Sequence, residues 1–156
     1  LTSNVVGFSK WIFDKQLIYI GGGNTAYMLE LWKNYNLINI FKNAYEKGII
    51  LSGVSAGGVC WFDWILTDSL GSGYKPLKGI NLISGSCTPH SLEDNRMSQY
   101  QSEIKKNKLP PGVAIDDGVA VLFVNGVAKE VCSTRENCDA YFVDKNNKIS
   151  LKEYIK

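Results

Sequence analysis

The segment Gly53-Val54-Ser55-Ala56-Gly57 is the part of the chain whose residue types and spacing most directly indicate chemistry. An apolar run at residues 48–52 precedes it and a helix is predicted over residues 56–66, so Ser55 would stand on a sharp turn between strand and helix. Glycines suit that turn because a Cβ would clash with the tight backbone. The same letters also occur in tight turns without a catalytic role. This context nevertheless favours a nucleophilic serine in a hydrolase, with the N–H of Ala56 pointing at a developing oxyanion.

His90 is the only histidine in the chain, so any imidazole that activates Ser55 must be this one. A lone loop histidine usually has no role. His90, however, follows an expected parallel strand, at the edge where active sites of open α/β sheets lie, and Pro89 restricts the backbone before it. Because imidazole exchanges protons near neutral pH, His90 is our candidate general base.

A third group must orient the imidazole and stabilise its cation. Asp116 and Asp117 follow an expected strand and precede a glycine, although two acids in that position equally suit a plain turn. Asp68 is a further candidate, although its surroundings also resemble the end or the cap of a helix. The residues alone leave these three acids as alternatives.

The loop Gly21-Gly22-Gly23 enters a predicted helix, and a glycine loop in that position can bind an anion. It lacks the G-x-G-x-x-G spacing and the Walker lysine, so a nucleotide site is only weakly supported. The N–H of Gly22 or Gly23 would serve equally well as the second half of an oxyanion hole, opposite Ala56. Asn24 would cap the following helix and fix the loop.

Arg96 is one of two arginines in the chain. We expect it on the solvated side of a helix. If its loop folds over the site, its guanidinium would bind a substrate carboxylate through two hydrogen bonds. Asn24 and Arg96 are therefore our candidate substrate-binding residues.

The elements that must position these residues predict an α/β fold with a mostly parallel sheet flanked by helices. Strands are expected at residues 17–20, 48–52, 80–83, 113–116, 119–124, 127–131, 140–143 and 149–151. Helices are expected from Asn24 or Thr25 to about Tyr35, and at residues 38–47, 56–66 and 92–107. Asn125-Gly126 between apolar runs predicts a β-hairpin, and a second hairpin is expected around residues 145–148.

Composition narrows the class of protein. A length of 156 residues suits one domain, and a formal net charge of +2 does not indicate nucleic acid or an anionic membrane as partner. No apolar run approaches the roughly 20 residues that span a bilayer. The four cysteines lack metal spacing, so we expect reduced thiols in a cytoplasmic protein without metal or organic cofactor. The oligomeric state stays open.

Four motifs, in this order, resemble the peptidase E family of serine peptidases (type S51), which includes cyanophycinases. They are Ile18-Tyr19-Ile20-Gly21-Gly22-Gly23-Asn24-Thr25, Gly53-Val54-Ser55-Ala56-Gly57, Pro89-His90 and Ile115-Asp116-Asp117-Gly118. The resemblance runs from about Leu17 to Val131. The order serine, histidine, acid also differs from the serine, acid, histidine order of α/β-hydrolases.

The resemblance implies a fold like that of class I glutamine amidotransferases (flavodoxin-like), with C-terminal β-hairpins and a serine in place of the nucleophilic cysteine. It implies Ser55 as nucleophile and His90 as base. Because family members usually begin with another strand and helix, we expect residues 1–156 to be a single α/β hydrolytic domain that lacks an N-terminal βαβ portion.

The resemblance also ranks the acids. Asp117 falls where peptidase E and cyanophycinase have a glutamate, and Asp68 falls where the family often has an aspartate. We therefore take Asp117 as the first choice and keep Asp116 and Asp68 as alternatives. Ser91 departs from the family, because relatives commonly carry an aromatic residue there.

The predicted function is that of a serine-type peptidase acting on short peptides, with Asp-X dipeptides as the substrates that the resemblance implies. The alternative is a non-catalytic module that binds a small anion at the glycine loop. An acyltransferase using the same three residues is a third interpretation.

Overall fold

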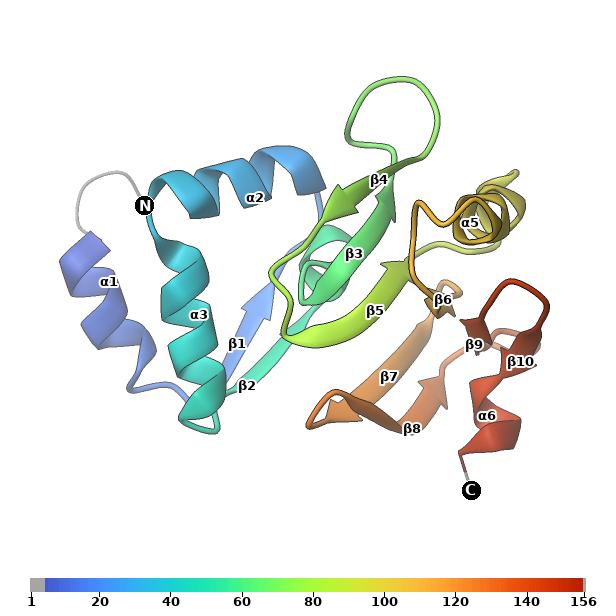
Figure 1. Cartoon of the computed structure of the whole chain (residues 1–156). Coiled ribbons are helices and arrows are strands. Elements are labelled where there is room, and N and C mark those ends of the chain that lie inside the picture. Colours follow the sequence, from blue (N-terminus) through green and yellow to red (C-terminus); the bar gives the residue numbers. More distant parts are fainter. Residues whose placement is uncertain (1–4, 156) are drawn as a thin grey trace. The chain divides into compact units, whose positions relative to one another are not determined.

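The chain divides after Gly58 into two compact units, and the computed structural model describes residues 5–155. Figure 1 shows the order of helices and strands along the chain. Each unit contributes a set of parallel strands with loops at their carboxyl ends.

The unit that ends at Gly58 is built on two parallel strands, β1 (Leu17–Ile20) and β2 (Ile50–Gly53). Its helices are α1 (Val5–Ile12), α2 (Thr25–Asn34) and α3 (Leu37–Glu46). Asn24 caps α2, because its Oδ1 accepts a hydrogen bond of 2.8 Å from the N–H of Tyr27. The cap predicted from the sequence is therefore confirmed. The rings of Trp32 and Phe41 pack α2 against α3, with 4.5 Å between their centroids.

The unit that begins at Val59 contains a six-stranded sheet in the order β10-β9-β6-β5-β3-β4. These strands are β3 (Phe62–Thr67), β4 (Lys75–Lys78), β5 (Ile83–Thr88), β6 (Gly112–Ile115), β9 (Ala140–Val143) and β10 (Lys148–Ser150). The three central strands β3, β5 and β6 run parallel, whereas β4, β9 and β10 pair in the antiparallel sense. The sheet is thus mixed, and the expected parallel character holds for its centre only.

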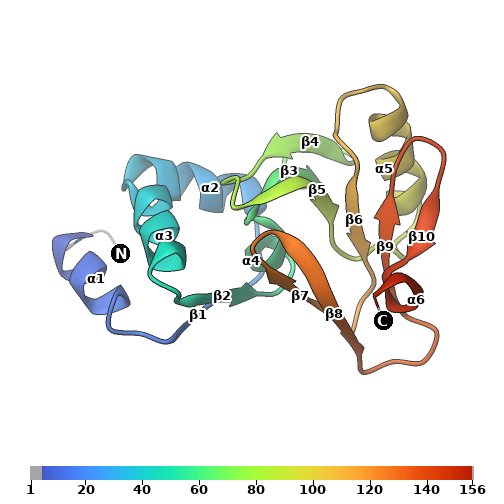
Figure 2. The ribbon, with the colours of Figure 1, turned by 60° about the horizontal axis from the view of Figure 1, so that its bottom comes forward.

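One helix, α5 (Arg96–Lys105), packs on the sheet and closes the core of this unit (Figure 2). The shared core consists of buried side chains from the helix, from the strands β3, β6 and β9, and from the loop that follows the helix. They are Leu66, Tyr100, Ile104, Leu109, Ala114 and Val143. This packing fixes the loop of residues 89–95, because the loop joins the core strand β5 to the helix.

The predicted hairpin at Asn125-Gly126 is confirmed. Both turn residues have positive φ (52° and 77°), as a two-residue turn that follows the strand twist requires. The turn joins β7 (Val119–Val124) to β8 (Val127–Ser133). The rings of Phe123 and Phe62 meet edge to face at 5.3 Å, so this hairpin packs on β3. A final turn of helix, α6 (Leu151–Tyr154), follows β10.

The helix predicted over residues 56–66 is wrong beyond its first turn. Helix α4 spans only Ala56–Val59, and the next residues form β3 between β5 and β4. Two glycines in the first turn weaken the helix, and the aromatic side chains that follow suit a buried strand at least as well. Pairing on both sides then decides in favour of the strand.

Smaller differences concern the ends of elements. The strand expected at residues 80–83 begins only at Ile83, and the helix expected at residues 92–107 begins only at Arg96. Helix α1 and strand β4 were not expected at all. No helix within residues 5–155 has the length and apolar character that a membrane span requires.

Candidate functional site

Ser55 stands between β2 and α4 with a φ of 54°. This left-handed conformation costs a residue other than glycine about 1–2 kcal/mol, and it persists only where the surrounding structure enforces it. The N–H of Gly57 donates to the carbonyl of Val54, and that of Gly58 donates to the carbonyl of Ser55, which closes the turn. The expected sharp turn from strand to helix is therefore present.

Two glycines make this turn possible. A Cβ on Gly53 would lie 2.3 Å from the carbonyl oxygen of Gly57, and a Cβ on Gly57 would lie 2.2 Å from that of Ile20. Neither distance is possible for real atoms, so β1, β2 and the elbow pack backbone to backbone. This is the steric reason that the sequence pattern indicated.

The glycine loop lies beside the serine. A Cβ on Gly22 would be 3.2 Å from Cβ of Ser55 and 3.8 Å from its Oγ, whereas a Cβ on Gly23 would meet nothing within 4 Å. Of the two loop glycines named from the sequence, Gly22 is therefore the one whose backbone borders the hydroxyl. Ala56 follows Ser55 directly and is buried.

In the second unit, the side chains of His90 and Asp117 contact each other. Nδ1 of His90 lies 2.5 Å from Oδ1 of Asp117. Their side chains are 29% and 43% exposed, so both are partly accessible to solvent. A carboxylate only accepts hydrogen bonds, so Nδ1 carries the proton in this contact, and Nε2 is the nitrogen that can act as a base. This is the relation between acid and base that hydroxyl activation requires.

Asp116 and Asp68, the two alternative acids, have other partners. Asp116 is buried and accepts hydrogen bonds from the hydroxyl of Ser91 and, at 2.9 Å, from the N–H of Asp139. Asp68 is largely exposed and lies 3.5 Å from Nη2 of Arg96. Of the three candidate acids, Asp117 is the one whose carboxylate reaches the imidazole.

Arg96 is not the solvated residue that we expected, because its side chain is only 2% exposed. Nη1 lies 2.8 Å from Oε2 of Glu93, and the guanidinium carbon lies 4.4 Å from the centroid of the Tyr74 ring. The Tyr74 hydroxyl also donates to Glu93, at 3.3 Å, and burial raises the pKa of Tyr74. The guanidinium thus has ion pairs with Glu93 and Asp68 and a ring contact with Tyr74, while its buried Nε has no hydrogen-bond partner within residues 5–155.

The glycine loop, Ser55, His90 and the candidate acids each follow the carboxyl end of a parallel strand. In the first unit, the glycine loop follows β1 and Ser55 follows β2. In the second unit, Asp68, His90 and Asp117 follow β3, β5 and β6, which are neighbours in the sheet. Carboxyl ends of adjacent parallel strands meet at one edge, where binding sites of α/β sheets form.

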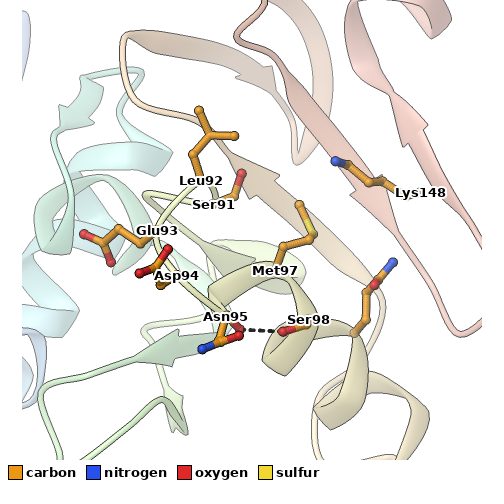
Figure 3. A pocket seen from close by; sticks show the side chains of 9 residues that line it. Ser91, Leu92, Glu93, Asp94, Asn95, Met97, Ser98 and Lys148 are labelled. Carbon is orange, nitrogen blue, oxygen red and sulfur yellow. Dashed lines mark hydrogen bonds between the residues drawn. The ribbon is translucent and has the colours of Figure 1, made fainter.

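A shallow pocket of about 420 Å³ is lined in part by Ser91, the residue after His90 (Figure 3). Its lining comes from the loop before α5, from the first turns of that helix and from β10: Ser91, Leu92, Glu93, Asp94, Asn95, Met97, Ser98, Gln101 and Lys148. Polar and charged side chains predominate, with Lys148 facing the loop across the pocket.

The cysteines offer no competing nucleophile in this region. All four are free thiols, and Cys132 is the exposed one. Burial raises the pKa of Cys60 and of Cys87 far above the ordinary range, and a carboxylate partner, Glu130, raises that of Cys132. A thiol that stays protonated is a poor nucleophile. Within residues 5–155, no group of histidine, cysteine and acidic side chains is arranged to hold a metal ion.

The sequence did not reveal the partners of these residues. Glu93 and Tyr74 around Arg96, and Ser91 on Asp116, carry no motif. The sequence offered one signal for these contacts, which is that Ser91 follows His90 and Asp116 precedes Asp117. Only the fold shows that the two neighbouring pairs make two neighbouring contacts.

Comparisons with known proteins identify the family of this chain. The profile of peptidase family S51 matches residues 6–131, which include the elbow, His90 and Asp117. An uncharacterized peptidase, YgaJ, of Bacillus subtilis (strain 168) is 37% identical over 143 residues. That alignment covers 91% of this chain and 60% of the relative, so the chain spans about three fifths of that protein's length.

Proposed function

Because this chain belongs to peptidase family S51, we propose that it is a serine-type peptidase that hydrolyses short peptides. The observation that carries the proposal is the geometry of Ser55, held at a positive φ between two glycines that admit no Cβ. A hydroxyl presented on such an elbow is typical of a nucleophile.

The proposed reaction uses three side chains. Ser55 Oγ attacks the carbonyl carbon of the peptide while Nε2 of His90 takes its proton. Asp117, hydrogen-bonded to Nδ1, holds the ring and stabilises its cation. His90 then returns the proton to the leaving amine, and water hydrolyses the acyl-enzyme by the same route. The mechanism requires Nε2 of His90 to come within about 2.6–3.2 Å of Ser55 Oγ.

The developing oxyanion needs hydrogen-bond donors of its own. We assign them to the N–H groups of Ala56 and Gly22, with Gly23 as the alternative to Gly22. Support comes from the position of Gly22 beside Ser55. Loss of one such donor typically costs about 10²–10³ in kcat.

We also propose a domain architecture and a cellular location for the chain. We assign the chain to one α/β hydrolytic domain of the class I glutamine amidotransferase type. Parallel strands followed by the proposed site residues in each unit support this assignment. Four free thiols support a protein of the reducing cytoplasm.

Asp-X dipeptides are the substrates that we propose to test first. Arg96 would bind the aspartyl carboxylate, which must then replace Glu93 on the guanidinium. Asn24 would contribute by ordering the glycine loop through its cap on α2.

The proposal is tested by hydrolysis of a set of Asp-X, neutral and β-aspartyl dipeptides by the wild type and two variants. Ser55→Ala and His90→Ala should each lower turnover by more than about 10³-fold while circular dichroism and melting temperature stay unchanged. Hydrolysis at the wild-type rate by Ser55→Ala would remove the mechanism. A folded wild type that binds small anions but cleaves no peptide would favour the non-catalytic module instead.

A further inference from the structure

A second contact runs alongside the bond between His90 and Asp117. The next residue after His90 is Ser91, and the residue before Asp117 is Asp116. The hydroxyl of Ser91 donates to Oδ1 of Asp116, and the N–H of Ser91 donates to the carbonyl of Ile115 at 3.1 Å. Two neighbouring residues of one loop are thus bound in register to two neighbouring residues of the other.

The two contacts differ sharply in burial. Ser91 and Asp116 are each only 3% exposed, whereas Asp117 is 43% exposed. A hydrogen bond to a buried carboxylate is stronger than the same bond in water, and leaving that carboxylate unpaired is costly. An exposed contact is weakened by solvent and contributes little rigidity by itself. The buried contact is therefore the one that can hold the two loops together.

His90 needs such support. Its φ is 51°, a left-handed conformation that favours glycine and costs other residues about 1–2 kcal/mol. The carbonyl of His90 accepts a bond of 3.0 Å from the N–H of Glu93, which closes the turn on one side. On the other side, Asp116 is itself fixed, because its N–H donates to the carbonyl of Asp139 at 3.0 Å and its Oδ2 accepts from the N–H of Asp139.

We propose that Ser91 and Asp116 form a positioning pair that holds His90 in the orientation in which Asp117 binds Nδ1. The pair touches no reacting atom. It acts through the backbone, because each of its members is covalently next to a member of the proposed catalytic pair. The inference rests on the proposed function for its kinetic consequence only, since the contact between His90 and Asp117 can be measured without a substrate.

The test is the far-downfield proton resonance that an imidazole N–H gives in a short hydrogen bond to a carboxylate. In the wild type this resonance is assigned by its loss in Asp117→Asn. Ser91→Ala should broaden or abolish it. Ser91→Cys, which keeps the shape of the side chain but donates a weaker hydrogen bond, should reduce it even if Ser91→Ala fails to fold. Asn39→Ala, which removes a side-chain hydrogen bond to Asn36 at the start of α3, in the unit that contains neither His90 nor Asp117, is the control and should leave it unchanged.

Kinetics give the second readout. Ser91→Ala should lower kcat by about 10- to 100-fold, the loss expected for a misplaced catalytic group, with KM within about twofold of the wild type. A full-strength resonance in both Ser91 variants would overturn the inference. If no peptide is hydrolysed by the wild type but the resonance still depends on Ser91, the positioning pair stands and the proposed function fails.

Discussion

At the scale of single residues, the structure distinguishes between the three aspartates that were candidates for the catalytic acid. Three aspartates follow parallel strands, but they have different partners. Asp117 contacts the imidazole of His90, Asp116 is buried and accepts a hydrogen bond from Ser91, and Asp68 lies beside Arg96. The residues alone do not distinguish them, because adjacent residues in a turn point in different directions and the fold decides which direction faces the histidine. Only the resemblance to the peptidase E family put Asp117 first.

Exchange of the acids tests this assignment. Asp117→Asn should lower kcat by about 10³–10⁴-fold, because an amide in this position favours the wrong tautomer of His90. Asp68→Asn should lose less than about tenfold, since its partner is Arg96 at an exposed site. Steady-state kinetics on one substrate decide the matter. A larger loss in Asp68→Asn than in Asp117→Asn would contradict the assignment.

Arg96 shows a second limit of sequence interpretation, because neither its burial nor its partners could be predicted from a polar segment. Its contact with Glu93 nevertheless leads to a prediction about substrates. Glu93→Gln should raise the ratio of kcat/KM for Asp-X over Ala-X dipeptides by about 2- to 5-fold, the scale of a partly exposed ion pair. The neutral amide would compete less well with the substrate for the guanidinium.

The control for this prediction is Glu136→Gln, an exposed acid on the loop after β8, which should leave the ratio unchanged. If Glu93→Gln lowers the ratio or leaves it constant, Arg96 does not bind the acidic side chain of a substrate.

At the scale of elements, the sequence correctly predicted those helices, strands and turns that are determined by interactions between residues close together in the chain. Strand β1, helices α2 and α3 and the hairpin at Asn125-Gly126 all lie where caps, glycines and apolar periodicity indicated. Strand β3 is the clear failure, because Trp61, Phe62 and Trp64 fit a helix face as well as a strand. Its pairing with β5 and β4 involves residues far along the chain, which no local pattern reports.

The elbow itself was predicted with its steric reason, and that reason can be measured. Gly57→Ala should destabilise the protein by about 2 kcal/mol or more, since a Cβ there would collide with the carbonyl oxygens of Ile20 and Gly21. Gly21→Ala is the matched control, because its Cβ would meet nothing within 4 Å. Urea unfolding of both variants gives the comparison, and equal midpoints would show that β1 and the elbow do not pack as described.

At the scale of the whole molecule, the proposed nucleophile and the proposed base belong to different units. Ser55 lies before the division at Gly58, and His90 and Asp117 lie after it. The proposed mechanism depends on the transfer of a proton from Ser55 to His90. The order of the four motifs in the sequence favours the same residues, but it gives no distance between their side chains.

The rate at which a fluorophosphonate labels Ser55 tests this dependence most directly, because the probe needs an activated serine and no particular substrate. The labelled residue is identified by peptide mass spectrometry, and the second-order rate constant is compared in the wild type and His90→Ala. We expect a single adduct on Ser55, and labelling slower by at least about 10²-fold in His90→Ala. An adduct elsewhere, or labelling of Ser55 at the wild-type rate without the imidazole, would contradict the proposed mechanism.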